Sequence, residues 1–166
     1  NIGALNSYEV SKSKFVGLAV LLIDLAKGML AVYLTKLLFE PIFINPMLAL
    51  FFAVAGHCFS PWIKFKGGRG LATAAGGSLV FVPAILVIWS LLWVIAFIFR
   101  KHVHFANIAA TFLTGAIALT SAQVLNKYSM PMAESNLFYG ISVALTMVII
   151  LIKHKEPFKE WMSSKK

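Results

Sequence analysis

The segment Lys64–Thr73 reads KFKGGRGLAT and combines three cations with three glycines in its first seven positions. Backbone N–H groups beside glycines can approach an anion closely, and the apolar run from Leu71 predicts a helix whose N-terminus adds positive potential. A phosphate group suits this chemistry. The alternative is a plain basic turn whose cations only mark one side of a membrane. The glycines favour the phosphate, because a turn needs only one or two of them.

A second group of chemically active residues interrupts an apolar run. Asp24 and Lys27 are three positions apart, so on a helix their side chains share a face and can neutralise each other. Ionisable groups at that depth in a membrane are costly, which makes the pair a candidate site, with a structural tie between helices as the alternative. Lys27 can also extend toward a lipid headgroup, and Gly28 lets a helix or ligand come close.

Several further polar residues flank the apolar runs. His57 precedes the basic segment and is either a hydrogen-bonded structural residue or part of the same site. The N-terminal stretch NIGALN predicts a loop, and its asparagines Asn1 and Asn6 can donate amide N–H groups to a phosphate or hydroxyl. His102 and His104 have no carboxylate or cysteine nearby in sequence, so no metal site is expected.

The composition places these residues in a membrane. Of the 166 residues, 60% are hydrophobic and 13% charged, and the mean hydropathy is +0.84. The net charge of +9 comes from short clusters between apolar runs, which argues against a nucleic-acid partner. The single cysteine, Cys58, excludes a disulfide within the chain. We expect an all-α, polytopic integral membrane bundle that forms one domain over residues 1–166.

The apolar runs predict about six membrane spans, since a bilayer core takes about 20 residues as helix. Four are clear, at residues 15–34, 43–63, 105–125 and 137–152. The 29-residue region Leu71–Phe99 is too long for one span. Pro83 can break it, so two short spans or a re-entrant hairpin are both open.

The distribution of charged residues favours a Leu71–Phe99 region that returns to the side of the membrane on which it starts. One side of the membrane then holds Lys12, Lys14, Lys64, Lys66, Arg69, Arg100, Lys101, Lys153, Lys155, Lys159, Lys165 and Lys166. The other side holds only Lys36 and Lys127, which is the asymmetry that the positive-inside rule describes. The N-terminal stretch, the basic segment and the tail from Lys153 onward are therefore expected on the cytoplasmic face.

Taken in order, these motifs resemble the PlsY family of bacterial membrane acyltransferases. The first loop of the family reads close to GNIGATN, and this chain offers NIGALN at residues 1–6. The pattern LxDxxKG is matched at residues 22–28, and GHxFPxFxxFKGGKGVAT is similar to residues 56–73, with Arg69 in place of a lysine. The resemblance covers roughly the first half of the chain. A serine and a further span, which precede GN in the family, are expected upstream.

The second half departs from the family pattern. The RxxSxxS positions fall on Lys101, His104 and Asn107, and the HxxNIxRLxxGxE positions on His154, Pro157 and Glu160. Arg69 keeps its charge and gains a bidentate fork. Glu9 replaces an arginine of the first loop, and this reversal costs several kcal/mol at a distance of about 4 Å and an effective dielectric constant of about 20.

The resemblance implies transfer of a fatty acyl group from acyl phosphate to the sn-1 hydroxyl of glycerol 3-phosphate. The product would be lysophosphatidic acid, in the first step of phospholipid synthesis at the bacterial inner (plasma) membrane. The implied partners are both substrates and membrane lipid, without cofactor or metal, and the protein is expected to be a monomer. Two alternatives stay open: a non-catalytic relative that binds or transports lipid phosphates, and an acyltransferase with a different acceptor.

The residues that the resemblance and the motifs single out fall into two groups. The catalytic candidates are Arg69, His57 and Asn6, and the substrate-binding candidates are Asn1, Gly3, Asp24, Lys27, Lys66, Gly67, Gly68, Gly70, Thr73 and His154. Acyl phosphate is a mixed anhydride that needs little activation. Binding two anions close together and orienting the hydroxyl would therefore supply most of the rate.

Overall fold

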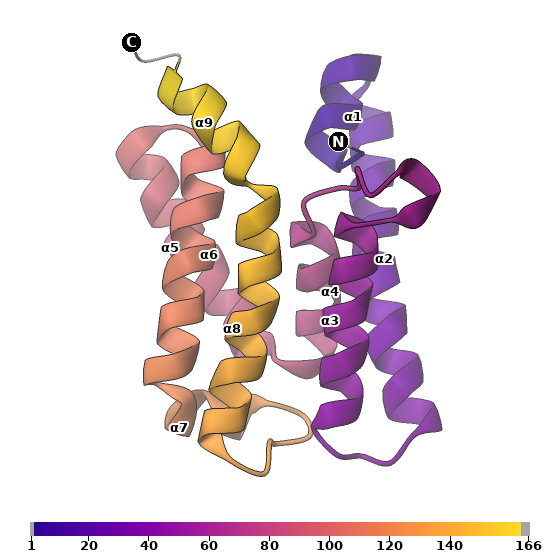
Figure 1. The fold of residues 1–166 in the computed structure, drawn as a ribbon, viewed down its shortest axis with the longest axis vertical. Coiled ribbons are helices and arrows are strands. Elements are labelled where there is room, and N and C mark those ends of the chain that lie inside the picture. The colour runs from indigo at the N-terminus through magenta and orange to yellow at the C-terminus, as the bar shows by residue number, and fades with distance from the viewer. Residues whose placement is uncertain (1, 164–166) are drawn as a thin grey trace. The chain divides into compact units, whose positions relative to one another are not determined.

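The computed structural model describes residues 2–163 as helices joined by loops, with no strand in that range (Figure 1). In chain order the elements are α1 (Ala4–Ser11), α2 (Lys14–Leu38), α3 (Ile44–Cys58), η1 (Pro61–Ile63), α4 (Leu71–Phe81), α5 (Pro83–Arg100), α6 (Val103–Thr120), α7 (Ala122–Leu125), η2 (Asn126–Tyr128), α8 (Asn136–Lys153) and α9 (Lys155–Ser163). The predicted all-α fold is confirmed.

Five helical segments of the described chain are long and apolar enough to cross a membrane. They are Lys14–Leu38, Ile44–Ile63, Pro83–Arg100, Val103–Thr120 and Asn136–Lys153. Each of the four clear spans predicted from the sequence corresponds to one of them. The chain is thus a multi-pass membrane protein.

The fifth predicted region breaks at Pro83. Helix α4 ends at Phe81 and α5 begins at the proline, because proline has no N–H to donate to a preceding turn and its ring blocks continuation of the helix. With 11 residues, α4 is roughly 16 Å long, about half the thickness of a hydrocarbon core. The region consists of one short apolar helix and one long helix, so five long helices and α4 stand where six spans were expected.

Residue contacts divide the chain at the same point into two compact units. Unit 1 is Asn1–Val82 and unit 2 is Pro83–Lys166. The single domain over residues 1–166 stays a prediction.

In unit 1, α2 packs against α1, α3 and α4, and its contact with α4 is the most extensive. A Cβ atom on Gly28 of α2 would collide with the carbonyl group of Thr73, and one on Gly76 of α4 would collide with that of Leu25. Small residues permit such close approach of helices in membranes. The first turn of α4 therefore lies directly against Gly28, one residue from Lys27.

Residues 4–6 are helical where the sequence predicted a loop. Gly3 is the N-cap of α1, which extends from Ala4 to Ser11 and packs on α2. A Cβ atom on Gly17 would lie 2.9 Å from the Cβ of Tyr8, so the two helices meet at close range. A helix of eight residues is marginal by itself, and tertiary packing of this kind, which the local sequence pattern does not reveal, stabilises it.

In unit 2, α6 contacts both α5 and α8. Its buried face is rich in small side chains, among them Ala106, Ala110 and Ala118, which allow the neighbouring helices to approach. His102 caps this helix, because its Nδ1 accepts a hydrogen bond from the backbone N–H of Phe105 over 3.4 Å.

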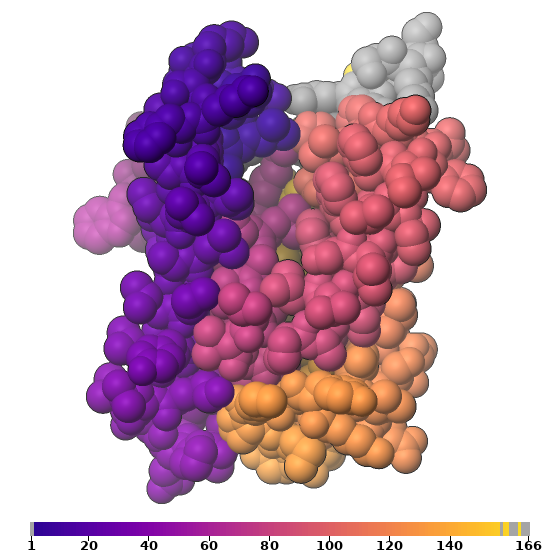
Figure 2. Space-filling view, turned by 180° about the vertical axis from the view of Figure 1, so that it is seen from behind, coloured from indigo at the N-terminus to yellow at the C-terminus, as the bar shows by residue number. Residues whose placement is uncertain are grey.

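Large apolar side chains cover the outer surfaces of α2 and α5. On α2 they include Phe15, Leu18, Leu22, Leu30 and Tyr33, and on α5 Val87, Leu91, Ile95, Ile98 and Phe99. Figure 2 shows a large part of the surface of α2, in indigo and violet. Exposed apolar surface of this extent suits contact with lipid chains and not with water.

Candidate active site

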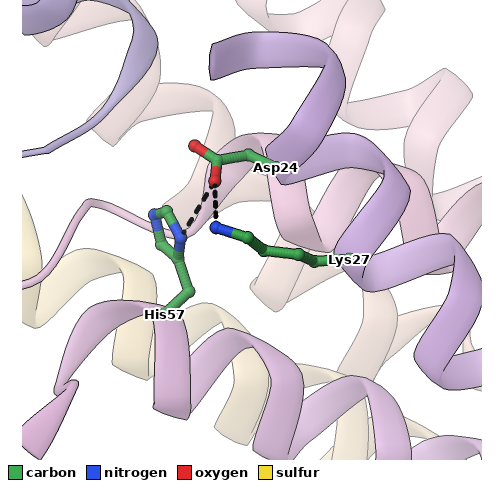
Figure 3. Close-up of polar contacts among 3 residues, drawn as sticks. All are labelled: Asp24, Lys27 and His57. Carbon is green, nitrogen blue, oxygen red and sulfur yellow. Dashed lines mark hydrogen bonds and ion pairs between the residues drawn. The ribbon is translucent and has the colours of Figure 1, made fainter. Parts of the chain in front are cut away.

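Three ionisable side chains of unit 1 meet at Asp24 (Figure 3). The Oδ1 atom of Asp24 accepts a hydrogen bond from Lys27 Nζ over 3.0 Å and lies 3.4 Å from His57 Nδ1. The side chains of Asp24 and His57 are each 5% exposed, whereas that of Lys27 is 55% exposed. The predicted pairing of Asp24 with Lys27 is confirmed, and His57 is a third member.

His57 also holds the basic segment in place. The backbone N–H of Gly68 donates to the carbonyl oxygen of His57 over 3.0 Å. A Cβ atom on Gly68 would collide with His57 Nε2, and one on Gly67 would collide with the His57 carbonyl oxygen. The two glycines are thus required for docking on the end of α3, a reason that the sequence did not reveal. Their contact with a phosphate stays a prediction.

The basic segment has an unusual backbone. Lys64 and Phe65 have φ values of 53° and 61°, in the left-handed region that side chains disfavour by about 1–3 kcal/mol each. Gly70 follows with a φ of 84° and caps α4. This path leaves the side chain of Lys66 exposed and that of Arg69 half-buried.

The N-terminus of α4 has the features of an anion site. No side chain caps the helix, and its first backbone bond in the helical register runs from Ala74 N–H to the Gly70 carbonyl over 2.8 Å. The preceding N–H groups have no acceptor within the helix and lie at the positive end of its dipole. Thr73 is fully buried, and its Oγ1 has no hydrogen-bond partner among the described residues. The arrangement is suited to a phosphate held by backbone N–H groups, a hydroxyl and nearby cations.

Unit 1 brings most of the predicted site residues to one end. Figure 1 shows α1, which carries Asn6, and the loop after η1, which carries Arg69, at the same end of this unit. Gly3 accepts from the Ser7 N–H over 3.0 Å, and Asn6 is half-buried. Asn1 lies outside the described residues.

His154 belongs to unit 2 and is almost completely buried, with 1% exposure. Its ring contacts Asn107 of α6 and the Ile150 carbonyl of α8. Asn107 and its partner Trp93 were not predicted as site residues, since they are distant in sequence from His154 and no motif joins the three. Among the described residues, no group of three His, Cys, Asp or Glu side chains could hold a metal ion.

These features define a class: a multi-pass helical membrane protein with a cationic loop and a helix N-terminus that lacks a side-chain cap, at one end of a helical unit. The sequence matches the glycerol-3-phosphate acyltransferase family over residues 1–164, and the chain belongs to that family. The resemblance to PlsY proteins is thereby confirmed.

Glycerol-3-phosphate acyltransferases of several bacteria are similar to this chain in sequence. The glycerol-3-phosphate acyltransferase of Fusobacterium nucleatum is 37% identical over 113 residues, which are 68% of this chain and 57% of the relative. That of Bartonella quintana is 30% identical over 156 residues, which are 93% of this chain and 68% of the relative. This chain thus spans between about half and three quarters of the length of such relatives.

Two solved structures share the fold. They are the glycerol 3-phosphate form and the lysophosphatidic acid form of PlsY, an integral membrane glycerol 3-phosphate acyltransferase. The TM-scores are 0.72 and 0.73 at 24% sequence identity, and the matches cover this whole chain and 76% and 78% of the neighbours.

Proposed function

We propose that this protein transfers a fatty acyl group from acyl phosphate to the sn-1 hydroxyl of glycerol 3-phosphate and so forms lysophosphatidic acid. Family membership supports acyl transfer, and the two PlsY structures are described with the corresponding acceptor and product. The observation that carries the proposal furthest is the position of the first turn of α4. It lies against Gly28 beside Lys27, and only the N-cap Gly70 separates the helix from Arg69.

The donor phosphate would bind at the basic segment. Backbone N–H groups in the first turn of α4 and the side chains of Lys66 and Arg69 supply positive potential there, and the Thr73 hydroxyl lacks a partner among the described residues. The acyl chain would extend into the surrounding lipid. Interactions that strengthen as the phosphate leaves would lower the barrier, because the leaving group gains negative charge.

The acceptor would bind beside Lys27. Lys27 is half exposed while Asp24 fixes its amine, so it can offer a positioned charge to the phosphate of glycerol 3-phosphate. Asn6 would orient the hydroxyl, with the N-terminal residues Asn1 and Gly3 beside it. His154, which the sequence predicted for this role, lies in unit 2.

The reaction itself needs few catalytic groups. The acceptor oxygen attacks the carbonyl carbon, the new ester C–O bond forms, and the bond from that carbon to the phosphate oxygen breaks. The hydroxyl proton passes to a substrate phosphate, and inorganic phosphate leaves. Orientation of two bound anions accounts for most of the rate. His57 and Asp24 would act by holding the loop and Lys27 in place.

A different acceptor is the second candidate, and Glu9 favours it. This carboxylate is exposed on α1, the helix that carries Asn6. A negative charge there disfavours a doubly charged acceptor.

The active face would be cytoplasmic, at the inner membrane of a bacterium.

The experiment uses the purified protein in detergent with synthetic palmitoyl phosphate. Formation of lysophosphatidic acid from glycerol 3-phosphate is the expected result. Product only with glycerol or another glycerol-like acceptor would support the second candidate. No product with any acceptor would exclude acyl transfer and leave a protein that binds lipid phosphates.

A further inference from the structure

A chain of three polar side chains crosses the interior of unit 2. The indole Nε1 of Trp93 on α5 lies 2.6 Å from Asn107 Oδ1 on α6. An indole N–H can only donate, so the atom that faces it must be the amide oxygen. The amide nitrogen of Asn107 then points the other way, 3.5 Å from His154 Nε2.

The other ring nitrogen of His154, Nδ1, faces a group that can only accept a hydrogen bond. This atom lies 2.8 Å from the Ile150 carbonyl oxygen, which can only accept, so Nδ1 carries a proton. Nε2 faces an NH₂ group, which can only donate, so Nε2 offers its lone pair. These two hydrogen bonds are mutually consistent for one state of the ring: neutral, with the proton on Nδ1.

Burial makes any other protonation state of the His154 ring costly in free energy. His154 and Asn107 are 1% and 8% exposed. A proton on Nε2 would place two donors against each other in a buried site. A second tryptophan stabilises the same part of α6, because Trp89 Nε1 donates to Thr111 Oγ1 over 3.0 Å and Thr111 donates to the Asn107 carbonyl over 2.7 Å.

We propose that Trp93 and Asn107 are positioning residues that hold His154 as a neutral Nδ1–H tautomer. In this state Nε2 accepts from Asn107 and cannot donate to a phosphate, so His154 is not a direct phosphate ligand. Its role is to tie the C-terminal end of α8 to α6, because the ring contacts the Ile150 carbonyl on α8 and Asn107 on α6. The statement on the phosphate rests on the proposed function; the tautomer does not.

The residue type at position 107 is decisive. The resemblance places Asn107 where the family pattern has a serine. A serine hydroxyl can turn to donate or accept, so it would leave the tautomer open. An asparagine whose oxygen is occupied by an indole presents only donors to the ring.

The test is a nitrogen NMR spectrum of the protein in nanodiscs with ¹⁵N-labelled histidine, in which the His154 signals are identified by their loss in His154→Gln. The expected wild-type signals are those of one protonated nitrogen, Nδ1, and one unprotonated nitrogen, Nε2. In Asn107→Asp the carboxylate keeps an oxygen for Trp93 and turns an acceptor toward Nε2, so both ring nitrogens should be protonated. A wild-type ring protonated on Nε2, or an unchanged ring in Asn107→Asp, would overturn the proposal.

Two further variants keep the test decisive should Asn107→Asp fail to fold. Trp93→Phe keeps a ring but removes the N–H that orients the amide, so a second His154 state with a protonated Nε2 is expected. An unchanged spectrum would refute the role of Trp93. Asn136→Asp, an exposed asparagine of the same unit, should leave the His154 signals unchanged.

Titration with glycerol 3-phosphate separates this proposal from the proposed function. If Trp93 and Asn107 hold the tautomer, Nε2 of His154 stays unprotonated at saturating glycerol 3-phosphate. Appearance of an Nε2 proton would make His154 a phosphate ligand and refute the inference. The spectra are informative even for a protein without transferase activity, so failure of either proposal is recognised independently.

Discussion

The Nδ1 atom of His57 lies 3.4 Å from the Oδ1 atom of Asp24, which joins the end of α3 to the middle of α2. The same carboxylate oxygen accepts from Lys27, so one buried acid orients both a half-exposed cation and the histidine on which the basic segment docks. Asp24 therefore links the basic segment to Lys27, which are the proposed donor and acceptor sites of unit 1.

Asp24→Asn removes the charge and keeps a similar shape. A hydrogen bond to a charged group contributes about 1.5–3 kcal/mol, so kcat/KM should fall roughly tenfold to a hundredfold. Initial rates of acyl transfer measure this. Glu40→Gln neutralises an exposed acid of the same unit and should leave the rate unchanged. Equal rates in the two variants would show that Asp24 does not organise the site.

Gly68→Ala places a methyl group against the His57 ring. Overpacking of this kind costs about 1–3 kcal/mol, and the loop must move away from α3 to relieve it. We expect a lower thermal unfolding temperature and loss of most activity. Gly56→Ala is the matched control, because its Cβ would have no atom within 4 Å, and it should behave as wild type. A fully active Gly68→Ala protein would contradict the docking of the loop.

Lys27→Ala tests the acceptor site. The KM for glycerol 3-phosphate should rise on the order of tenfold, because one charged hydrogen bond to the phosphate is lost, while the KM for palmitoyl phosphate changes little. Lys36, whose Nζ contacts the Val80 carbonyl over 3.3 Å, lies on the same helix and serves as control. If Lys36→Ala raises this KM as much as Lys27→Ala, the assignment of Lys27 is wrong.

Glu9→Gln tests the charge reversal at position 9, which lies on α1. Glu9 is exposed, and interactions between exposed charges amount to about 0.2–1 kcal/mol instead of the several kcal/mol expected from the sequence, so the KM for glycerol 3-phosphate should fall by up to about fivefold. The gain should shrink at high salt, where such charges are screened. A KM that is unaffected at low salt would place the acceptor away from α1.

Local patterns in the sequence predicted the parts of this structure that depend on short spacing. The span positions, the break at Pro83 and the pairing of Asp24 with Lys27 all follow from hydropathy or from residues within one helical turn. Helix α1 was not predicted, because the packing of Tyr8 against Gly17 stabilises it and its own sequence carries no strong helix signal.

Long-range contacts explain what the sequence did not reveal in the candidate site. The glycines of the basic segment suggested a ligand, whereas at Gly67 and Gly68 the space is needed for the backbone and ring of His57. The contact of Asn107 with His154 joins residues 47 positions apart. No periodicity or motif links such positions, so only the folded chain brings them together.

Acyl transfer by Arg69→Ala, compared with Arg100→Ala, tests the central claim most directly. Both variants remove one arginine, but Arg100 lies at the end of α5 in unit 2, outside the basic segment. With palmitoyl phosphate and glycerol 3-phosphate, Arg69→Ala should lose about a hundredfold in kcat, as expected for a group that stabilises the leaving phosphate, and Arg100→Ala should retain wild-type activity. Full activity in Arg69→Ala, or an equal loss in both, would contradict a donor phosphate held at the basic segment.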